Sequence, residues 1–318
     1  MVTVRSARGG RRAGFERWRA IVRRDAIMNR YAYLMALPMI TYYILFCYMP
    51  MYGVVIAFQD FSPARGILGS TWVGLKHFRM FFNGAFFVRL LRNTLLINVI
   101  NLAFGFPAPI LLALLLNELR QARFKRVVQT VSYLPHFISV MVICGMIIDF
   151  TSSRGIVNDF IAFFGGERQT MLLNPAYFRS VYVVSEIWQG VGWGSIIYLS
   201  ALAGIDAEQY EAAVIDGAGR FAQLVNITLP GIAPTIVIML IMRIGQLMNV
   251  GYEKIILLYN GNTYDVADVI STFVYRKGLV EADYSYSTAV GLFNSVVNLA
   301  LLLMANTISR KVSETSLW

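Results

Sequence analysis

The feature that most constrains this chain is a series of long apolar runs, since a helix needs roughly 20 mostly apolar residues to cross a bilayer. The runs cover residues 31–58, 94–116, 127–149, 181–203, 231–249 and 288–308. Hydrophobic residues make up 57% of the 318 residues and charged residues 14%, whereas charged residues make up about a quarter of soluble domains. The sequence therefore predicts an all-α, polytopic membrane protein with about six transmembrane helices.

These runs divide the chain into three parts. Residues 1–30 form a basic N-terminal segment, residues 31–308 the transmembrane domain and residues 309–318 a tail. The first run follows basic residues, as the core of a secretory signal would, but it exceeds the roughly 7–15 residues of such a core and shows no convincing small-residue cleavage site. We therefore expect a retained helix.

Lys and Arg near the ends of the runs predict the orientation, because positive charges tend to stay in the cytoplasm. They gather before the first run, after the second run and in the tail, at Arg5, Arg8, Arg11, Arg12, Arg17, Arg19, Arg23, Arg24, Arg30, Arg120, Arg123, Lys125, Arg126, Arg310 and Lys311. Both termini and the loop between the fourth and fifth runs are therefore predicted to be cytoplasmic.

The charge bias is incomplete in the first outer loop, which contains Arg65, Lys76, Arg79, Arg89 and Arg92. Its stretch 72–92 mixes aromatic and basic residues, a pattern typical of a helix lying on the membrane surface. The formal net charge of +10 is spread over several loops and forms no single stripe, so we expect contacts with membrane lipid and none with nucleic acid.

The sequence predicts no metal site and no nucleotide site. Cys47 and Cys144 lie in apolar runs without ligand-like neighbours, and His77 and His136 are far apart in the sequence. No Gly-Lys-Ser or Gly-Lys-Thr follows a glycine-rich loop, so the phosphate-binding sequence of an ATPase is missing. We therefore expect a chain that is not an enzyme and binds no cofactor, and that draws energy from a partner or from an ion gradient.

The loop 204–230, between the fourth and fifth runs, has the pattern of two short helices. Asp206 can cap a helix over 207–216, and Gly217 can adopt the left-handed conformation that ends it. A second short helix is predicted over 220–227, with Pro230 at the foot of the next span. The loop is acidic on an otherwise basic side, which favours a docking surface.

The sequence of this loop resembles the EAA loop by which permease subunits of ABC importers contact their ATPase. The matching residues run from Glu211-Ala212-Ala213 through Gly217 to Ile227-Thr228-Leu229-Pro230. The resemblance implies that the ATPase-coupling residues are Tyr210, Glu211, Ala212, Ala213, Asp216, Gly217, Leu229 and Pro230. On this hypothesis, residues 31–308 are a permease domain that includes the coupling loop 204–230.

Longer strings, at 249–260, 264–270 and 275–279, resemble the LplB-type polysaccharide permeases, a group that includes the alginate-importer permease. The resemblance implies a type I ABC importer permease fold in a bacterial cytoplasmic (inner) membrane. It also implies a second homologous permease subunit, two copies of an ABC ATPase that uses ATP and Mg, and an extracytoplasmic solute-binding protein. The implied substrate is an oligosaccharide or polysaccharide, with an acidic, alginate-like saccharide as one option.

Ionisable residues inside spans usually face a cavity or a partner. Glu186 in the fourth run and Arg243 in the fifth are predicted to pair. Aromatic and amide side chains that suit a sugar lie nearby in the sequence, and we expect the pathway to include Glu186, Trp188, Trp193, Arg243, Gln246, Asn249, Asn294 and Asn298. The alternative is interhelical packing without substrate contact. Gly190 and Gly194 have the spacing of a close helix contact, and Pro107 and Pro109 are expected to kink the second span.

A different class of function remains open on the sequence alone. An ion-coupled secondary transporter would act without an ATPase, through carboxylates in the membrane and often through inverted repeats. Glu186 and Asp149 are the carboxylates available, and the halves of the chain show no repeat.

Overall fold

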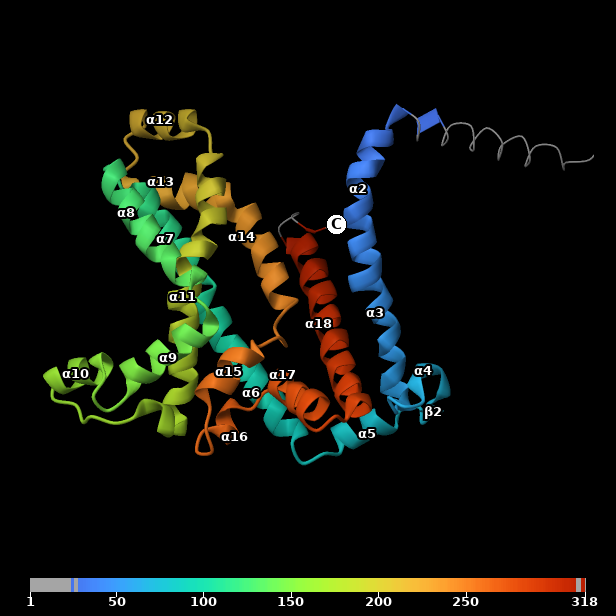
Figure 1. Ribbon diagram of the computed structural model, residues 1–318. Helices are drawn as coiled ribbons and strands as arrows, with labels where there is room; N and C mark the ends of the chain where they lie inside the picture. Colours follow the sequence, from blue (N-terminus) through green and yellow to red (C-terminus); the bar gives the residue numbers. More distant parts are fainter. Residues whose placement is uncertain (1–23, 26–27, 313–315, 318) are drawn as a thin grey trace, which may run out of the picture. The chain divides into compact units, whose positions relative to one another are not determined.

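The computed structural model describes residues 24–25, 28–312 and 316–317 (Figure 1). Most of the predicted basic N-terminal segment and part of the predicted tail therefore lie outside the described residues. The chain divides into two units, 1–55 and 56–318, which are described separately.

The first unit is an apolar helix without a polar face. Helix α2 (Arg30–Tyr42) continues through a π-helical turn (Tyr43–Tyr48) into α3 (Met49–Met51), and a 3₁₀ segment (Tyr52–Phe58) completes a 29-residue run. Large apolar side chains are exposed around its whole circumference. A helix that is apolar all round is typical of a membrane span, as predicted.

The second unit begins with a small hairpin and leads into a long helical run. Strands β1 (Gln59–Asp60) and β2 (Thr71–Trp72) pair in antiparallel fashion around α4 (Gly66–Gly69), and α5 (Lys76–Phe82) follows. Helix α6 (Phe87–Ile100), a π-helical turn (Asn101–Gly105) and α7 (Pro107–Glu118) form a 32-residue span.

One expectation for this region needs correction. The predicted surface helix over 72–92 is wrong as a single element, because the chain leaves the helical conformation between α5 and α6. Directly before Pro107 and Pro109, where the sequence predicts a kink, the span contains a π-helical turn. Proline has no N–H for the helical ladder, so the hydrogen bonds shift in the preceding turn.

The predicted third run, 127–149, is not one helix. Helix α8 (Ala122–Tyr133) ends in a 3₁₀ turn (Leu134–Phe137), and α9 (Val140–Thr151) and α10 (Ile156–Phe163) follow. Pro135 lies in the turn, and the Ser139 hydroxyl accepts a hydrogen bond from Val142 N at 3.4 Å and so caps a new helix. By length and composition, the run able to cross a membrane here is Val140–Phe163.

The remaining helices surround α11 (Pro175–Ala203), which bends by 68° into α12 (Ala207–Ile215). Helix α13 (Arg220–Gln223), a π-helical turn (Leu224–Thr228) and α14 (Leu229–Ile244) form the next long run. Three short helices follow, α15 (Tyr252–Leu258), α16 (Tyr264–Ala267) and α17 (Ile270–Tyr275). A π-helical turn (Arg276–Val280) then leads to α18 (Tyr284–Val312).

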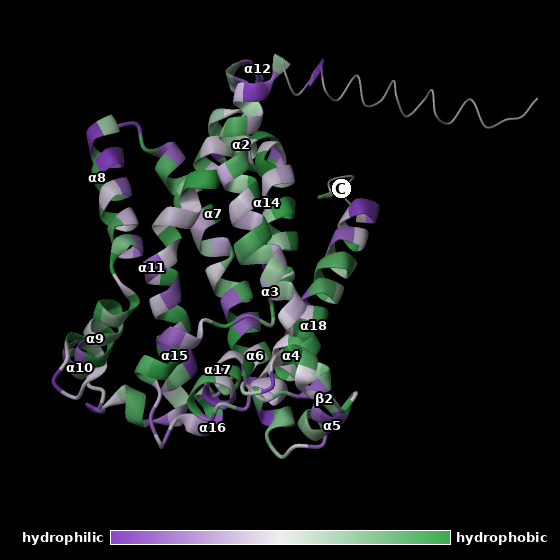
Figure 2. Cartoon of the chain, turned by 45° about the vertical axis from the view of Figure 1, so that its right-hand side comes forward, coloured by the Kyte–Doolittle hydropathy of each residue, from purple (hydrophilic) through white to green (hydrophobic). Residues whose placement is uncertain are grey.

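The described residues contain 5 helices long and apolar enough to span a membrane, or up to 6 if the bent pair α11–α12 is one span. This count agrees with the predicted polytopic, all-α fold. Within the second unit, α12 and α13 lie at one end of the bundle, and α5, α16 and α17 lie at the other (Figure 1). Apolar residues dominate α14 and α18, whereas hydrophilic residues gather on α12 and in the loops at the opposite end (Figure 2).

Helix α11 contacts α8 more closely than the predicted glycine spacing indicates. A Cβ atom added at Gly192 would lie 2.0 Å from the carbonyl oxygen of Ser132, so only glycine permits this approach to the α8 backbone. A Cβ atom at Gly190 would meet nothing within 4 Å, and one at Gly194 would meet the Pro109 side chain at 3.1 Å. Of the two glycines with the predicted spacing, Gly194 therefore lies in a close contact with α7, whereas Gly190 lies in no such contact among the described residues.

Candidate functional site

The predicted coupling loop folds as a capped short helix. The Asp206 carboxylate accepts a hydrogen bond from Glu208 N at 3.0 Å and caps α12 at its start. At the other end Gly217 has a φ of 77°, Ala218 N donates to Ala213 O at 2.8 Å and Gly217 N donates to Val214 O at 3.0 Å. This pair of hydrogen bonds is a Schellman motif, which fixes where α12 stops.

Side chains tie this helix to the rest of the bundle. The hydroxyl oxygens of Tyr210 and Thr228 lie 2.9 Å apart, within hydrogen-bonding distance, and Gln223 Nε2 donates to Ala218 O at 2.9 Å. The Arg220 guanidinium lies 3.5 Å from the Glu118 carboxylate at the end of α7, although both side chains are more than half exposed. The contact between Tyr210 and Thr228 therefore joins α12 to the π-helical turn that precedes α14, while the exposed ion pair adds little.

An apolar patch on this loop escaped the sequence analysis. Val214 is 62% exposed, Ile215 is 85% exposed and Phe221 is 78% exposed. With the exposed Glu211, these residues form what we call the coupling surface. The sequence signal for this patch was the large apolar residues on both sides of a glycine turn. The sequence analysis assigned the contact to the small residues Ala212 and Ala213 and did not consider these larger side chains.

Six of the eight predicted coupling residues lie on α12 and in the turn that ends it. Glu211, Ala212, Asp216 and Gly217 are exposed, whereas Tyr210 and Ala213 are partly buried. The other two, Leu229 and Pro230, lie in the first turn of α14. A π-helical turn precedes them, as at Pro107.

The predicted ion pair between Glu186 and Arg243 is wrong. Lys254 Nζ lies 2.7 Å from Glu186 Oε1, and the Lys254 side chain is only 4% exposed. Glu186 pairs with Lys254 because the residues after Gly251 form α15, which packs against α9 and α11. No predicted span includes Lys254, so the sequence did not indicate that this lysine would lie beside Glu186. Among the described residues, Arg243 makes no ion pair.

Glu186 and Arg243 nevertheless line one cavity of about 240 Å³, which we call the Arg243 cavity. Its walls come from the π-helical turn before α7 and from α7, α11 and α14, and they include Asn101, Pro109, Glu186, Gly190, Met239 and Arg243. Glu186 and Arg243 are its charged lining residues. A cavity between spans with a few charged and polar groups in a mostly apolar wall can hold and orient a solute.

The predicted amide residues form a separate cluster. Asn249 Oδ1 accepts hydrogen bonds from Asn294 Nδ2 at 2.8 Å and from Asn298 Nδ2 at 2.9 Å, and Asn298 Oδ1 accepts one from Met248 N at 2.9 Å. These bonds hold the chain after α14 onto α18. Gln246 is exposed near this cluster in sequence, and none of the predicted amide residues lines the Arg243 cavity.

The two predicted tryptophans lie on different faces of α11. Trp193 stacks on His136, with ring centroids 4.6 Å apart and an angle of 1° between the planes. Trp188 borders apolar grooves against α8 and α9 and does not line the Arg243 cavity. The two aromatic rings therefore do not lie together. Trp188 also does not share the Arg243 cavity with Glu186.

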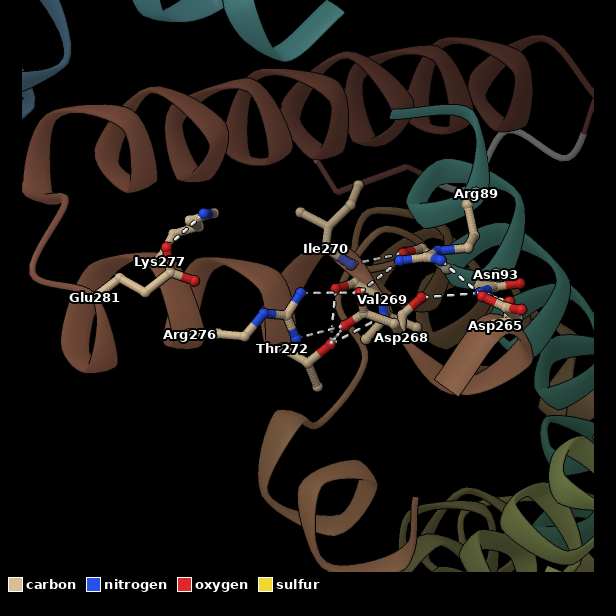
Figure 3. Close-up of polar contacts among 11 residues, drawn as sticks. Arg89, Asn93, Asp265, Asp268, Val269, Ile270, Thr272, Arg276, Lys277 and Glu281 are labelled. Carbon is tan, nitrogen blue, oxygen red and sulfur yellow. Dashed lines mark hydrogen bonds and ion pairs between the residues drawn. The ribbon is translucent and has the colours of Figure 1, made fainter. Parts of the chain in front are cut away.

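A buried ionic network fixes the end of the bundle opposite α12 (Figure 3). The fully buried Asp268 carboxylate accepts two hydrogen bonds from Arg276, at 3.2 and 3.0 Å, and one from Thr272 Oγ1 at 2.8 Å. Asn93 Nδ2, on α6, donates to the carbonyl oxygens of Asp265 and Asp268 at 2.8 and 2.9 Å. Burial alone would lower the pKa of Arg276, but the hydrogen bonds and charge of Asp268 raise it.

Titratable side chains do not gather elsewhere into a metal site. Within the described ranges, no group of three or more His, Cys, Asp or Glu side chains could hold a metal ion. Cys144 is buried, and Cys47 is exposed on the first-unit helix.

Long apolar helices, a cavity between them with two charged side chains on its wall and a capped helical loop at one end are typical of a multi-pass membrane permease. The chain belongs to the binding-protein-dependent transport system inner membrane component family, which matches residues 105–314. The fold is that of type I ABC importer permeases, as the sequence resemblance implied.

Individual relatives cover almost the whole chain. It is 48% identical to the polygalacturonan/rhamnogalacturonan transport system permease protein YteP of Bacillus subtilis (strain 168), over 92% of this chain and 91% of that protein. It is 45% identical to Protein LplB of the same organism, over 95% of this chain and 94% of that protein. A crystal structure of a bacterial ABC transporter involved in the import of the acidic polysaccharide alginate contains a chain that is 42% identical, with a TM-score of 0.84. That match covers 92% of this chain and 99% of the other.

Proposed function

We propose that this chain is the permease subunit of an ATP-driven importer that carries an acidic oligosaccharide across the bacterial cytoplasmic membrane. The observation that carries the proposal is the Arg243 guanidinium, which makes no ion pair with any described residue and lies on the wall of a cavity between spans. A cation without an internal partner is suited to meet a carboxylate of the solute. The names of two similar proteins, which concern polygalacturonan and alginate, support an acidic substrate.

The orientation follows the charge bias of the sequence. The basic residues at and just before the start of α8 and the basic end of α18 lie on the same side as α12, and this side is cytoplasmic in our proposal. The opposite end, with α5, α16 and α17, then faces the solute-binding protein. A crystal structure of the alginate transporter includes an alginate pentasaccharide-bound periplasmic protein, which supports such a partner.

The coupling surface is where a separate ATPase would dock. Its exposed apolar side chains Val214, Ile215 and Phe221 can insert into a groove of a partner, and its acidic residues can pair with cations on the rim. Because caps fix both ends of α12 and Tyr210 contacts Thr228 in the turn that leads into α14, a movement of the partner would pass to α14 without fraying the helix. ATP and Mg would be used by two copies of that ATPase, and a second homologous permease would complete the pathway.

The substrate assignment is tested with the reconstituted complex. Uptake and ATP hydrolysis are measured with oligogalacturonate and with a neutral oligosaccharide of matched length, for the wild type, Arg243→Gln and the control Arg310→Gln. A lost charge-assisted hydrogen bond is worth about 1.5–3 kcal/mol, so Arg243→Gln should raise the KM for the acidic solute by roughly 10-fold or more. Equal effects on both solutes would overturn the acidic assignment, and uptake without the ATPase would favour an ion-coupled transporter.

A further inference from the structure

Lys254 is a buried cation whose partners all belong to α11. Its Nζ donates to Glu186 Oε1 at 2.7 Å and to Gln189 Oε1 at 3.4 Å. The same nitrogen lies 5.6 Å from the centroid of the Tyr182 ring, within the range of a cation–π contact. A lysine that is 4% exposed needs such partners, because removing an unpaired charge from water is costly.

Glu186 stands between two cavities. It lines the Arg243 cavity, and it also lines a second cavity of about 190 Å³ with Tyr252, Glu253 and Lys254. Lys254 therefore reaches the Glu186 carboxylate from the second cavity and is absent from the lining of the first. Glu253, the other acidic residue of the second cavity, is exposed and so is screened by solvent.

The charges on these walls decide which solutes the Arg243 cavity favours. Its charged lining residues are one acid, Glu186, and one base, Arg243, which alone would cancel. Because Lys254 neutralises Glu186 at 2.7 Å, the charge of Arg243 remains in excess. Stability alone is a weak reason for a buried ion pair, since apolar residues of similar volume often serve as well.

We propose that Lys254 is a specificity-determining residue, which cancels the charge of Glu186 and thereby leaves the Arg243 cavity positive for an acidic saccharide. This inference rests on the proposed function. It assigns to α15, a short helix outside the long spans, an electrostatic effect on the pathway in addition to its packing against α9 and α11.

The test compares Lys254→Met, Glu186→Gln and the double variant in the reconstituted complex. The readout is the KM for oligogalacturonate divided by the KM for a neutral oligosaccharide of matched length. Lys254→Met leaves Glu186 uncompensated and should raise this ratio on the order of 10-fold, because charges several ångströms apart interact strongly at low dielectric. Glu186→Gln leaves two cations and should lower the ratio, and the double variant should return it towards the wild-type value.

A role of Lys254 in packing alone makes a different prediction. It would lower uptake of both solutes together and leave the ratio unchanged, with no rescue in the double variant, and this result would overturn the inference. If Lys254→Met does not assemble, two other variants test the inference. Glu186→Gln should lower the KM ratio, and Lys254→Arg, which keeps the charge, should leave it at the wild-type value. If Arg243→Gln changes the ratio but none of these variants does, the Lys254 inference fails and the proposed function stands. If Arg243→Gln also leaves the ratio unchanged, the acidic assignment itself fails.

Discussion

Gly217 offers a sharp test of whether the shape of the coupling loop matters more than its surface. Its φ of 77° lies in the left-handed region, and a Cβ atom added there would meet nothing within 4 Å. The cost of a substitution is therefore conformational and not steric, about 1–2 kcal/mol for an ordinary L-residue. A β-branched side chain should exceed this cost, whereas Asn tolerates the left-handed conformation.

We expect Gly217→Val to lower transport per ATP hydrolysed several-fold in the reconstituted complex, because α12 then loses the hydrogen bonds that fix its end. Gly217→Asn should behave nearly as the wild type. Gly219→Ala is the matched control, since Gly219 has a φ of −70° and equally open surroundings. The reasoning is refuted if Gly217→Asn is as damaging as Gly217→Val, which would indicate a contact with the partner, or if Gly217→Val couples normally.

Three further predictions concern the stability of the fold. Asp268→Asn should destabilise the protein by about 3 kcal/mol, because Arg276 loses a fully buried partner, whereas Asp265→Asn, at an 82% exposed side chain, should cost less than about 1 kcal/mol; thermal unfolding in detergent compares them. Gly192→Ala should lower thermal stability by at least about 1 kcal/mol through its clash with the α8 backbone, and Gly190→Ala should not; equal melting temperatures would contradict the close contact. Lys76 donates a hydrogen bond to Asp60 and holds the pKa of that carboxyl below its ordinary value of 3.8. The stabilisation of the hairpin by this contact is therefore present above pH 3.8 and is lost as pH falls through the lowered pKa. Hydrogen exchange at β1 and β2 should accordingly rise only below pH 3.8.

The apolar runs and the coupling loop were predictable because each depends on local sequence. Run length fixes a span, and Asp206 and Gly217 mark the ends of α12 through interactions within a few residues. The same local signals failed at 127–149, where a continuous apolar run hides the break at Pro135. Apolar composition alone does not distinguish one helix from two joined by a turn.

The cavity was less predictable because its partners are distant in the chain. Glu186 and Lys254 are 68 residues apart, and their contact depends on how α15 packs against α11. The sequence identified Glu186 and Arg243 as ionisable residues inside spans, and Arg243 was therefore the predicted partner of Glu186. Nothing in the sequence indicated that Lys254, which follows the fifth span, would lie within the bundle. Gly192 was missed for a related reason, since a close approach to Ser132 is a property of two helices and not of one spacing.

The measurement that tests the central claim most directly is ATP-dependent uptake of oligogalacturonate and of a neutral oligosaccharide of matched length by the reconstituted importer, with wild-type chain and with Arg243→Gln. Our account predicts that the wild type prefers the acidic solute and that Arg243→Gln removes most of this preference. Equal uptake of both solutes by the wild type, or an unchanged preference in Arg243→Gln, would contradict it.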